Sequence, residues 1–317
     1  MNKIINFQHK DMTVLDIAKI GCRIMRKAKL HPHFFVDHSL LKASLYLIYF
    51  YLQLPYEYNN PVFLNKKITE KEAFGIMALF ERRISERIPV EYITHEAYYL
   101  GNKFYVNKNV LVPRSLMNTQ FIDFLNSVHW ENYRVLDLCT GSGCIGITLA
   151  LLNPKIQVDL LDISDAALKV ALTNVKSYSL ENRLTCIQSN LFDNVQNKYD
   201  LIITNPPYIS DREYQKQPDE IKNEPIIALK GGIEGLDIIN KILAQSKHYL
   251  NPNGILIAEV GHSQAKILKK RYPNVPFKWF KYKDPSGKED LIDILIKWIG
   301  CLDSVFLCER KGLTDNF

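Results

Sequence analysis

The sequence predicts an α/β fold, a doubly wound parallel sheet preceded by a small helical domain. Three observations support this prediction. From residue 133 onward, strand-like apolar runs alternate with runs of helical periodicity, which is the pattern of a parallel sheet. A glycine-rich turn lies between the first of these strands and the helix that follows it. The first ninety residues, by contrast, show helical periodicity alone.

Length and composition limit the class of protein. At about 150 residues per domain, 317 residues suggest two domains. The chain is 47% hydrophobic and 23% charged, which is typical of globular proteins rather than disordered or fibrous ones. Its 40 basic and 34 acidic residues give a net charge of +6, which permits a nucleic-acid partner without requiring one.

Neither export nor a membrane is indicated. The longest apolar stretch, residues 43–54, is shorter than the ~20 residues that span a bilayer, and it predicts a buried helix instead. Residues 1–11 contain no apolar signal core. None of the six cysteines forms a C-x-x-C pair, and no His/Cys cluster has zinc spacing. We therefore expect reduced thiols, no metal and a cytoplasmic location.

The N-terminal elements follow from helical spacing and capping. Apolar residues recur at helical intervals from Val14 onward, and Thr69 and Glu72 have capping-box spacing ahead of a second apolar stripe. We therefore expect a helical domain over residues 1–90. Residues 91–112 are rich in β-formers and contain a Gly-Asn turn, so they predict a β-hairpin that leads into a second domain over residues 113–317.

In the second domain, strand-like runs alternate with helix-like runs. The expected strands are residues 135–138, 158–161, 184–188, 201–204 and 255–260. The expected helices are residues 144–152, 165–175 and 236–250. Ligands of such sheets bind beyond the carboxyl ends of the strands, at the topological switch point. The motifs described next fall at these ends.

The turn after the first strand contains a glycine fingerprint. Gly141, Gly143 and Gly146 fit G-x-G-x-x-G, and Asp162 closes the next strand about twenty residues later, where an acidic side chain can accept hydrogen bonds from ribose hydroxyls. The turn is compatible with a nicotinamide dehydrogenase. It is also compatible with S-adenosyl-L-methionine, because the glycines would let the backbone approach the adenosine and methionine portion, with Asp137 facing the ligand.

A second motif decides between these cofactors. The fourth strand ends in Asn205-Pro206-Pro207-Tyr208, in which the two prolines remove two backbone donors. This segment suits a planar –NH2 group, whose two N–H donors would meet the Asn205 side-chain oxygen and the Pro206 carbonyl while Tyr208 packs against the plane. A dehydrogenase has no need of such a set.

Together the two motifs resemble class I S-adenosylmethionine-dependent methyltransferases that act on planar nitrogens, such as DNA adenine N6 and protein glutamine N5 methyltransferases. The order of the remaining motifs resembles the protein-(glutamine-N5) methyltransferase family, roughly over residues 75 to 282. Those motifs are Pro113-Arg114-Ser115, Asn223-Glu224-Pro225, Gly231-Gly232, Gly235-Leu236-Asp237 and Glu259-Val260-Gly261.

Two branches of this family differ in their motifs. The release-factor branch typically has Pro-Arg-Pro and Asp-Leu-Gly-Thr-Gly. The branch that acts on ribosomal protein uL3 has Pro-Arg-Ser and Asp-Leu-Cys-Thr-Gly-Ser-Gly-Cys, as this chain does at residues 113–115 and 137–144. The resemblance therefore implies N5-methylation of a glutamine side chain of uL3, with the Gly-Gly-Gln glutamine of peptide chain release factors as the alternative. It also implies that the helical domain recognises the substrate.

The resemblance implies roles residue by residue. It assigns catalysis to Asn205, Pro206 and Tyr208, whose contacts would restore electron density to the amide nitrogen and aim it at the sulfonium methyl. Pro207 joins them in substrate binding, while Arg114 is left open between substrate contact and structural pairing. The implied cofactor contacts are Asp137, Thr140, Gly141, Gly143, Asp162, Asn190, Leu191, Phe192 and Asn205, with Phe104 either covering the cofactor or filling the core. At Asn190 the family usually has an acidic residue.

Other interpretations compete with this one. A DNA adenine methyltransferase is disfavoured because no DNA-recognition domain is evident and a charge of +6 is modest for a duplex binder. A non-catalytic ribosome-assembly module is disfavoured by the intact Asn205 and glycine turn. The spacing of Cys139 and Cys144 is poor support for a redox or metal role.

The C-terminal third carries two further expectations. The basic and aromatic run at residues 269–283 could contact rRNA, although a solvated helix face and edge strand explain it as well. Residues 284–302 have the character of an insertion, either a helix on the sheet edge or a partner surface, and residues 304–307 resemble a closing strand.

Overall fold

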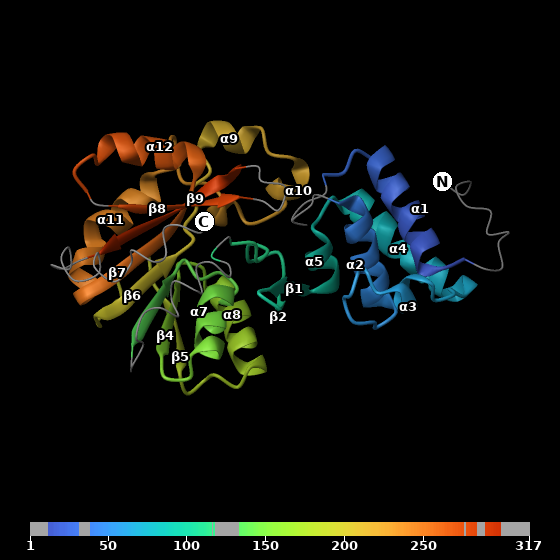
Figure 1. The fold of residues 1–317 in the computed structure, drawn as a ribbon, viewed down its shortest axis with the longest axis horizontal. Coiled ribbons are helices and arrows are strands. Elements are labelled where there is room, and N and C mark those ends of the chain that lie inside the picture. The colour runs from blue at the N-terminus through green and yellow to red at the C-terminus, as the bar shows by residue number, and fades with distance from the viewer. Residues whose placement is uncertain are drawn as a thin grey trace, which may run out of the picture. The chain divides into compact units, whose positions relative to one another are not determined.

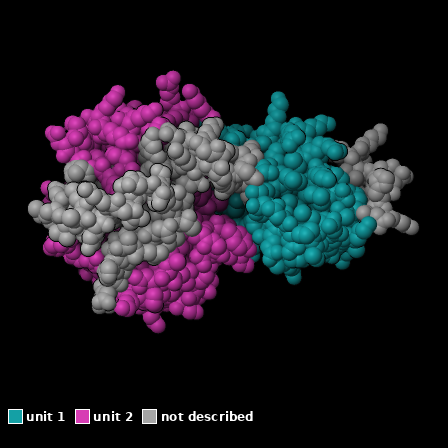
Figure 2. All heavy atoms as spheres, in the orientation of Figure 1, with its two compact units in different colours: residues 1–96, 106–108, 217–224 teal, residues 97–105, 109–216, 225–317 magenta. Residues whose placement is uncertain are grey.

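The chain forms two compact units. The computed structural model (Figure 1) describes residues 12–31, 39–115, 117, 133–275, 277–283 and 289–298. Unit 1 comprises residues 1–96, 106–108 and 217–224, and unit 2 comprises residues 97–105, 109–216 and 225–317 (Figure 2). The helical and α/β halves expected from the sequence thus correspond to two units, but a short segment from the α/β half belongs to the helical unit.

Unit 1 is a helical bundle whose apolar stripes form one core. Its helices are α1 (Val14–Lys27), α2 (Leu40–Tyr51), α3 (Pro61–Leu64), α4 (Glu70–Glu86), α5 (Val90–Thr94) and α10 (Asp219–Lys222). The predicted capping box of Thr69 and Glu72 is confirmed at the start of α4, and a second one starts α1. The apolar stretch at residues 43–54 lies largely in α2, whose residues 43–49 are all buried, so its prediction as a core helix is confirmed.

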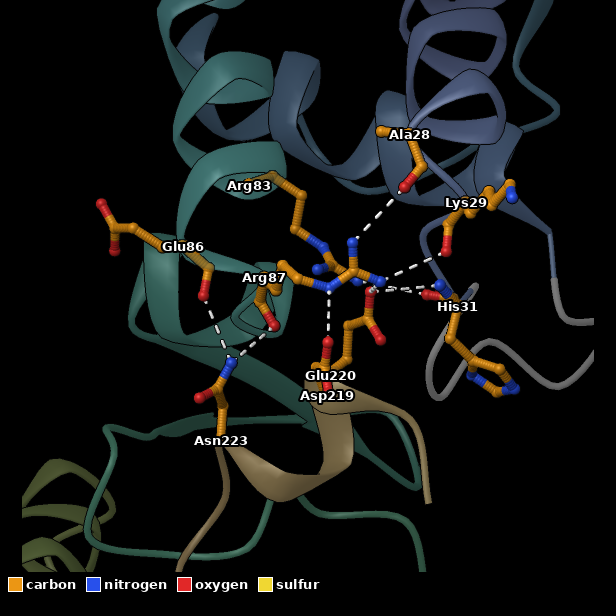
Figure 3. A network of polar contacts seen from close by, with 9 residues as sticks. All are labelled: Ala28, Lys29, His31, Arg83, Glu86, Arg87, Asp219, Glu220 and Asn223. Carbon is orange, nitrogen blue, oxygen red and sulfur yellow. Dashed lines mark hydrogen bonds and ion pairs between the residues drawn. The ribbon is translucent and has the colours of Figure 1, made fainter. Parts of the chain in front are cut away.

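A buried polar network holds α10 within unit 1 (Figure 3). The fully buried carboxylate of Glu220 pairs with Arg87 Nη2 at 2.8 Å and accepts the main-chain N–H of His31 at 3.2 Å. Arg83 is also buried and donates to the carbonyl of His31 at 3.2 Å. Burial lowers the pKa of Arg83 to about 10, against the opposing effect of Glu220 and Glu91. The network therefore places two guanidinium groups around one buried carboxylate.

The same segment is fixed at both of its ends. Asp219 pairs with Arg87 Nε at 3.4 Å, and the side-chain amide of Asn223 donates to the carbonyls of Glu86 and Arg87 at 3.2 and 3.0 Å. These contacts satisfy carbonyls at the C-terminus of α4, where a helix leaves its last acceptors without intrahelical partners. Residues 217–224 are thus an integral part of unit 1 (Figure 3).

The predicted hairpin is present but shorter than expected. Strands β1 (Glu96–Tyr99) and β2 (Asn102–Tyr105) are joined at Leu100 and Gly101, both with positive φ, as a tight right-twisted hairpin requires. The expectation of strand from residue 91 was wrong, because residues 90–94 form α5 after Pro89. The buried Asn174 fixes β2 in unit 2 by bonding both the N–H and the carbonyl of Tyr105.

Unit 2 contains a seven-stranded sheet in the order β5-β4-β3-β6-β7-β9-β8. The first five strands are parallel, and β9 is antiparallel to both of its neighbours. The strands are β3 (Arg134–Leu138), β4 (Gln157–Asp162), β5 (Leu184–Gln188), β6 (Tyr199–Thr204), β7 (Leu250–Gly261), β8 (Lys278–Lys283) and β9 (Glu289–Trp298). The five strands expected between residues 135 and 260 are present, although the parallel character ends at β7.

Helices cover both faces of this sheet (Figure 1). One core lies between the sheet and α7 (Cys144–Leu152) with α8 (Asp165–Ser177), and the other lies beneath α11 (Asp237–Tyr249) and α12 (His262–Arg271). Along β6, Leu201 and Ile203 face the first core and Ile202 faces the second. Because both faces are buried, the strands are continuous apolar runs rather than alternating ones.

The C-terminal segment corrects one prediction. Residues 289–298 are neither a helix nor an added surface element, because they form β9 between β7 and β8. A short apolar run fits a helix or a buried strand equally well. Here the run forms a strand because it can pair with β7 in antiparallel register. The helix face and edge strand expected around residues 269–283 are confirmed as α12 and β8. Residues 304–307 lie outside the described part of the chain.

Two short helices follow β6, namely α9 (Asp211–Gln215) and the 3-10 helix η1 (Ile226–Ala228). The switch point of the sheet lies between β3 and β6, since the chain proceeds outward from β3 to β5 and then returns to β6 on the other side. Throughout the described residues, we find no helix that combines the length and apolar character needed to cross a bilayer.

Candidate active site

A cavity of about 520 Å³ lies at the carboxyl ends of β3, β4 and β6, at the switch point of the sheet. Its volume falls within the ~300–1,000 Å³ that is common for small-molecule sites. Of the residues expected at a site, the cavity is lined by Arg114, Thr140, Gly141, Asp162, Asn190, Leu191, Asn205 and Pro207. The sequence motifs from three strand ends therefore meet in one place.

The glycine turn exposes its backbone to this cavity. Gly141 and Gly143 have φ values of +56° and +80°, which L side chains rarely adopt. A Cβ atom on Gly141 would have no atom within 4 Å, so the space in front of this residue is open. Gly146 instead lies against Leu160 and Asp137, where a Cβ would collide, and it lets α7 approach β4 closely.

Asp162 lines the cavity from the end of β4. Its Oδ2 accepts the Gly141 N–H at 2.9 Å and its Oδ1 accepts the Ser164 N–H at 2.9 Å. Burial raises the pKa of this carboxyl, and the backbone donors oppose that rise. Each oxygen keeps acceptor capacity beyond its one backbone bond, so the carboxylate can also receive ligand hydroxyl groups.

Asp137 is bonded to the glycine turn through one of its carboxyl oxygens. It is fully buried and does not line the cavity, although we expected it to face the ligand. Its Oδ2 accepts both the Thr140 hydroxyl at 2.6 Å and the Gly146 N–H at 2.9 Å. Burial raises the pKa of Asp137 to about 7, against the effect of these two hydrogen bonds. The residue therefore ties the turn to the first helical turn of α7.

The apolar side of the cavity is formed after β5. Leu191 lines it with a left-handed φ of +50°, and Cys139 lines it from the glycine turn with a φ of +61°. Such backbone is strained by about 1–3 kcal/mol per residue and accumulates at functional sites. Phe192 does not line the cavity but stacks on Tyr249 of α11 at 4.6 Å. Asn190 lines the cavity while its amide donates to Asp193 at 3.1 Å.

The Asn-Pro-Pro-Tyr segment leaves the end of β6 with one free amide. Asn205 is half-buried and lines the cavity, and its side chain makes no hydrogen bond with any residue of the described chain. Pro207 also lines the cavity, whereas Pro206 and Tyr208 do not. A half-buried amide that lines a cavity and has no partner in the described chain can bond a ligand.

The structure also bears on the roles expected for Arg114, Phe104 and the two cysteines of the glycine turn. Arg114 lines the cavity, with Nη1 3.5 Å from the Val112 carbonyl. Phe104 is fully buried in the core against Tyr178, so the core alternative holds. Burial raises the pKa of both Cys139 and Cys144, which disfavours the reactive thiolate. Among the described residues, the four cysteines are free and no His, Cys, Asp and Glu side chains cluster as metal ligands.

Sequence reasoning missed part of the cavity wall. Residues 109–112 line it ahead of Arg114, and Ile226 and Ile227 of η1 line it although about half of each side chain is exposed, 54% and 53% respectively. Lys230 and Asp211 also line it and pair at 2.7 Å. The only sequence signal for the isoleucines was their position directly after Asn223-Glu224-Pro225. These residues surround the cavity entrance with apolar and paired polar groups.

The site fits an adenosyl ligand. The open backbone at Gly141 forms a cradle that a Cβ would fill, Asp162 supplies acceptors for hydroxyl groups, and Leu191 supplies an apolar wall. Asn205 then lies on the same cavity, where a second molecule that carries an N–H group could meet the first. The arrangement can therefore bring a nucleoside cofactor and an amide together.

Comparisons with known proteins agree with this arrangement. A family model described as Methyltransferase small domain matches residues 119–224. The ribosomal protein uL3 glutamine methyltransferase of Neisseria meningitidis serogroup B is 37% identical over 290 residues, which are 90% of this chain and 93% of that protein. The protein of the same name from Neisseria gonorrhoeae is 36% identical over 293 residues, 90% of this chain and 94% of its own.

Among solved structures, the hMettl16 catalytic domain in complex with MAT2A 3′UTR hairpin 1 aligns with a TM-score of 0.52. The two sequences are 17% identical, and the alignment covers 75% of this chain and 85% of that chain. This likeness shows a shared fold.

Proposed function

This chain belongs to the family of ribosomal protein uL3 glutamine methyltransferases, and we propose that it methylates the side-chain nitrogen of a glutamine in uL3, with S-adenosyl-L-methionine as methyl donor. Its α/β unit has the class I methyltransferase fold. The observation that supports the proposal most directly is the unsatisfied amide of Asn205 on the cavity that Asp162 and the glycine turn also line.

The residues of the cavity would hold the cofactor in a defined way. Asp162 would accept the ribose hydroxyls, the Gly141 backbone would border the methionine portion, and Leu191 would border the adenine; all three residues line the cavity. Thr140 and Gly143 act through the shape of the turn, because Thr140 bonds Asp137 and the Gly143 N–H bonds the Thr140 carbonyl. When bound, S-adenosyl-L-methionine supplies a methyl group that its sulfonium sulfur makes electrophilic.

The acceptor amide needs help because its nitrogen lone pair is delocalised into the carbonyl. The Asn205 oxygen accepts one N–H of the amide and the Pro206 carbonyl accepts the other, which returns electron density to the nitrogen and orients it. Tyr208 packs against the amide plane, and Pro207 limits the pocket beside it. No strong base is needed beforehand, because the N–H becomes acidic only as the new bond forms.

Replacing Asp162 with asparagine is expected to weaken the binding of S-adenosyl-L-methionine by about 10- to 100-fold, since one hydrogen bond to a charged acceptor contributes about 1.5–3 kcal/mol. Isothermal titration of the cofactor measures this change. Asp165→Asn is the matched control, because Asp165 is an exposed carboxyl in the same segment that pairs only with the exposed Lys169. Equal affinities for the two variants would contradict the assigned role of Asp162.

Substrate recognition falls to other parts of the chain in this proposal. Unit 1 binds uL3, and its buried core keeps its surface fixed. The exposed lysines of α12, Lys266, Lys269 and Lys270, together with Lys278 of β8, give rRNA bound to uL3 a basic surface. Enzyme and substrate would meet in the cytoplasm, where the unbridged cysteines of the described chain stay reduced.

The proposal is tested by offering uL3 and a peptide chain release factor in parallel with S-adenosyl-L-methionine labelled in its methyl group. We expect label on uL3 and only background on the release factor. Label on the release factor alone would assign the chain to the other branch. Binding of the cofactor without label on either protein would favour a non-catalytic assembly module.

A further inference from the structure

We propose that Glu259 is a positioning residue for the reaction, which fixes the orientation of the Tyr208 ring before the glutamine arrives. The inference rests on the proposed function, since it concerns the residue assigned there to hold the amide plane. Glu259 lies near the carboxyl end of β7, is 1% exposed and does not line the cavity. Its hydrogen bonds go to the side chains of Tyr208 and Ser115, so it acts through them rather than on the substrate.

Both oxygens of the Glu259 carboxyl group are engaged at the site. Its Oε1 accepts the Tyr208 hydroxyl at 3.2 Å, and its Oε2 accepts the Ser115 hydroxyl at 2.6 Å. The two donors come from the Pro-Arg-Ser and Asn-Pro-Pro-Tyr motifs, which are 93 positions apart in the sequence. One buried carboxyl group thus joins the two motifs that carry the resemblance to the family.

Ser115 is itself held in place. Its hydroxyl accepts the Met117 N–H at 3.2 Å, while the hydroxyl of the buried Tyr99 donates to the Met117 carbonyl at 2.7 Å. The carboxyl group of Glu259 consequently meets a fixed donor on one side and is held in one rotamer. A fixed acceptor can orient the Tyr208 hydroxyl, whereas a mobile one could not.

The rest of Tyr208 is confined around its backbone. A Cβ on Gly235, which has a φ of +76°, would collide with the Tyr208 carbonyl, and one on Gly261 would lie 3.3 Å from the ring carbon Cδ2. The next residue, Ile209, pairs with Lys230 in a parallel bridge. With the backbone and one ring edge confined, the bond to Glu259 fixes the tip of a ring that stays half-exposed.

This arrangement matters because positive charge passes to the amide nitrogen in the transition state. An aromatic face attracts a neighbouring cation, and the attraction depends on how the ring is oriented. A tyrosine oriented in advance costs less to order when the substrate binds. Loss of the bond to Glu259 should therefore affect kcat more than cofactor binding.

A double-mutant cycle tests the proposal, with Glu259→Gln, Tyr208→Phe and the double variant measured on uL3. We expect each single variant to lower kcat about tenfold, the loss of one hydrogen bond with a charged partner, and the double variant to be no slower than Tyr208→Phe alone. Affinity for S-adenosyl-L-methionine should stay unchanged in all three. If the loss of kcat in the double variant equals the product of the two single-variant losses, the positioning role is overturned.

Two control variants distinguish the positioning role of Glu259 from a merely structural role. Ser115→Ala should lower kcat in the wild-type background but not beside Tyr208→Phe. Ser263→Ala removes a comparable hydroxyl, which bonds Glu213 at 2.7 Å without touching Tyr208, and should leave kcat unchanged. If wild type itself labels neither uL3 nor a release factor, the proposed function fails. If wild type is active and Glu259→Gln is equally fast, only this inference fails.

Discussion

An Asn205→Ala variant is expected to lose at least about 100-fold in kcat, the usual cost of removing one preorganised polar group from an active site. Its affinity for S-adenosyl-L-methionine should stay close to that of wild type, because in the proposed function Asp162 and the glycine turn would hold most of the cofactor. The reason lies in the amide of Asn205, which lines the cavity and has no side-chain partner among the described residues, so a ligand can bond it. Steady-state kinetics on uL3, combined with cofactor titration, measures both quantities.

The comparison with Asn205→Asp sharpens this experiment. Aspartate keeps an acceptor of the same size at the same position, so we expect this variant to be faster than Asn205→Ala on the same substrate. Near-normal turnover by Asn205→Ala would contradict the assigned role of the amide. A loss of cofactor binding that equals the loss of turnover would place Asn205 among the cofactor contacts instead.

The second large effect is expected in unit 1. Glu220→Leu should destabilise this unit by about 3 kcal/mol, because it leaves the buried Arg83 and the partly exposed Arg87 without the Glu220 carboxylate. The matched control is Glu86→Gln, which breaks an exposed ion pair with Arg82 at 2.9 Å and should cost about 0.5 kcal/mol or less. Glu220 is buried and Glu86 is exposed, and both lie near the C-terminal end of α4, so the two variants differ mainly in the burial of the carboxylate that is lost.

Amide hydrogen exchange resolves this effect by unit. Exchange in α1 and α4 should accelerate strongly in Glu220→Leu and little in Glu86→Gln. Trp279 belongs to unit 2, so a probe of its surroundings reports unfolding of that unit separately. Equal exchange in the two variants would show that the buried network does not stabilise unit 1.

The central strands were predictable because a strand that is buried on both faces of the sheet is a continuous run of apolar residues. Residues 201–203 belong to two cores at once, so they form an uninterrupted apolar run, and its place in an alternation of strand-like and helix-like runs favours a covered strand. The strand β9 was not predictable by the same reasoning. A run of that length fits a helix equally well, and its choice depends on the free edge of β7, to which it pairs in antiparallel register.

Contacts between residues that are far apart in the sequence account for the other differences between the predicted and the observed fold. Glu220 would ordinarily be expected at a surface, since an acidic residue is almost never fully buried without a partner. Its partners include His31, which is 189 positions away, so nothing near Glu220 in the sequence announces its burial. The assignment of residues 217–224 to unit 1 follows from these contacts and was not foreseen.

The site was predictable where a motif has a single chemical use. The glycine turn, Asp162 and Asn205 line one cavity, as their places at strand ends indicated. Asp137 shows the limit of such reasoning, because its place at a strand end is compatible with facing either the ligand or the turn. The role of the Glu259 carboxyl group could not be predicted either, since its two partners come from motifs that are distant in sequence.

The most direct test of the account is to locate the methyl group on uL3 after reaction with this protein. Peptide fragmentation by mass spectrometry assigns the added group to one residue and one atom. The account predicts a single methyl group on the side-chain nitrogen of one glutamine, and none when Asn205→Ala replaces the wild type. A methyl group on another type of residue, or on rRNA in place of uL3, would contradict it.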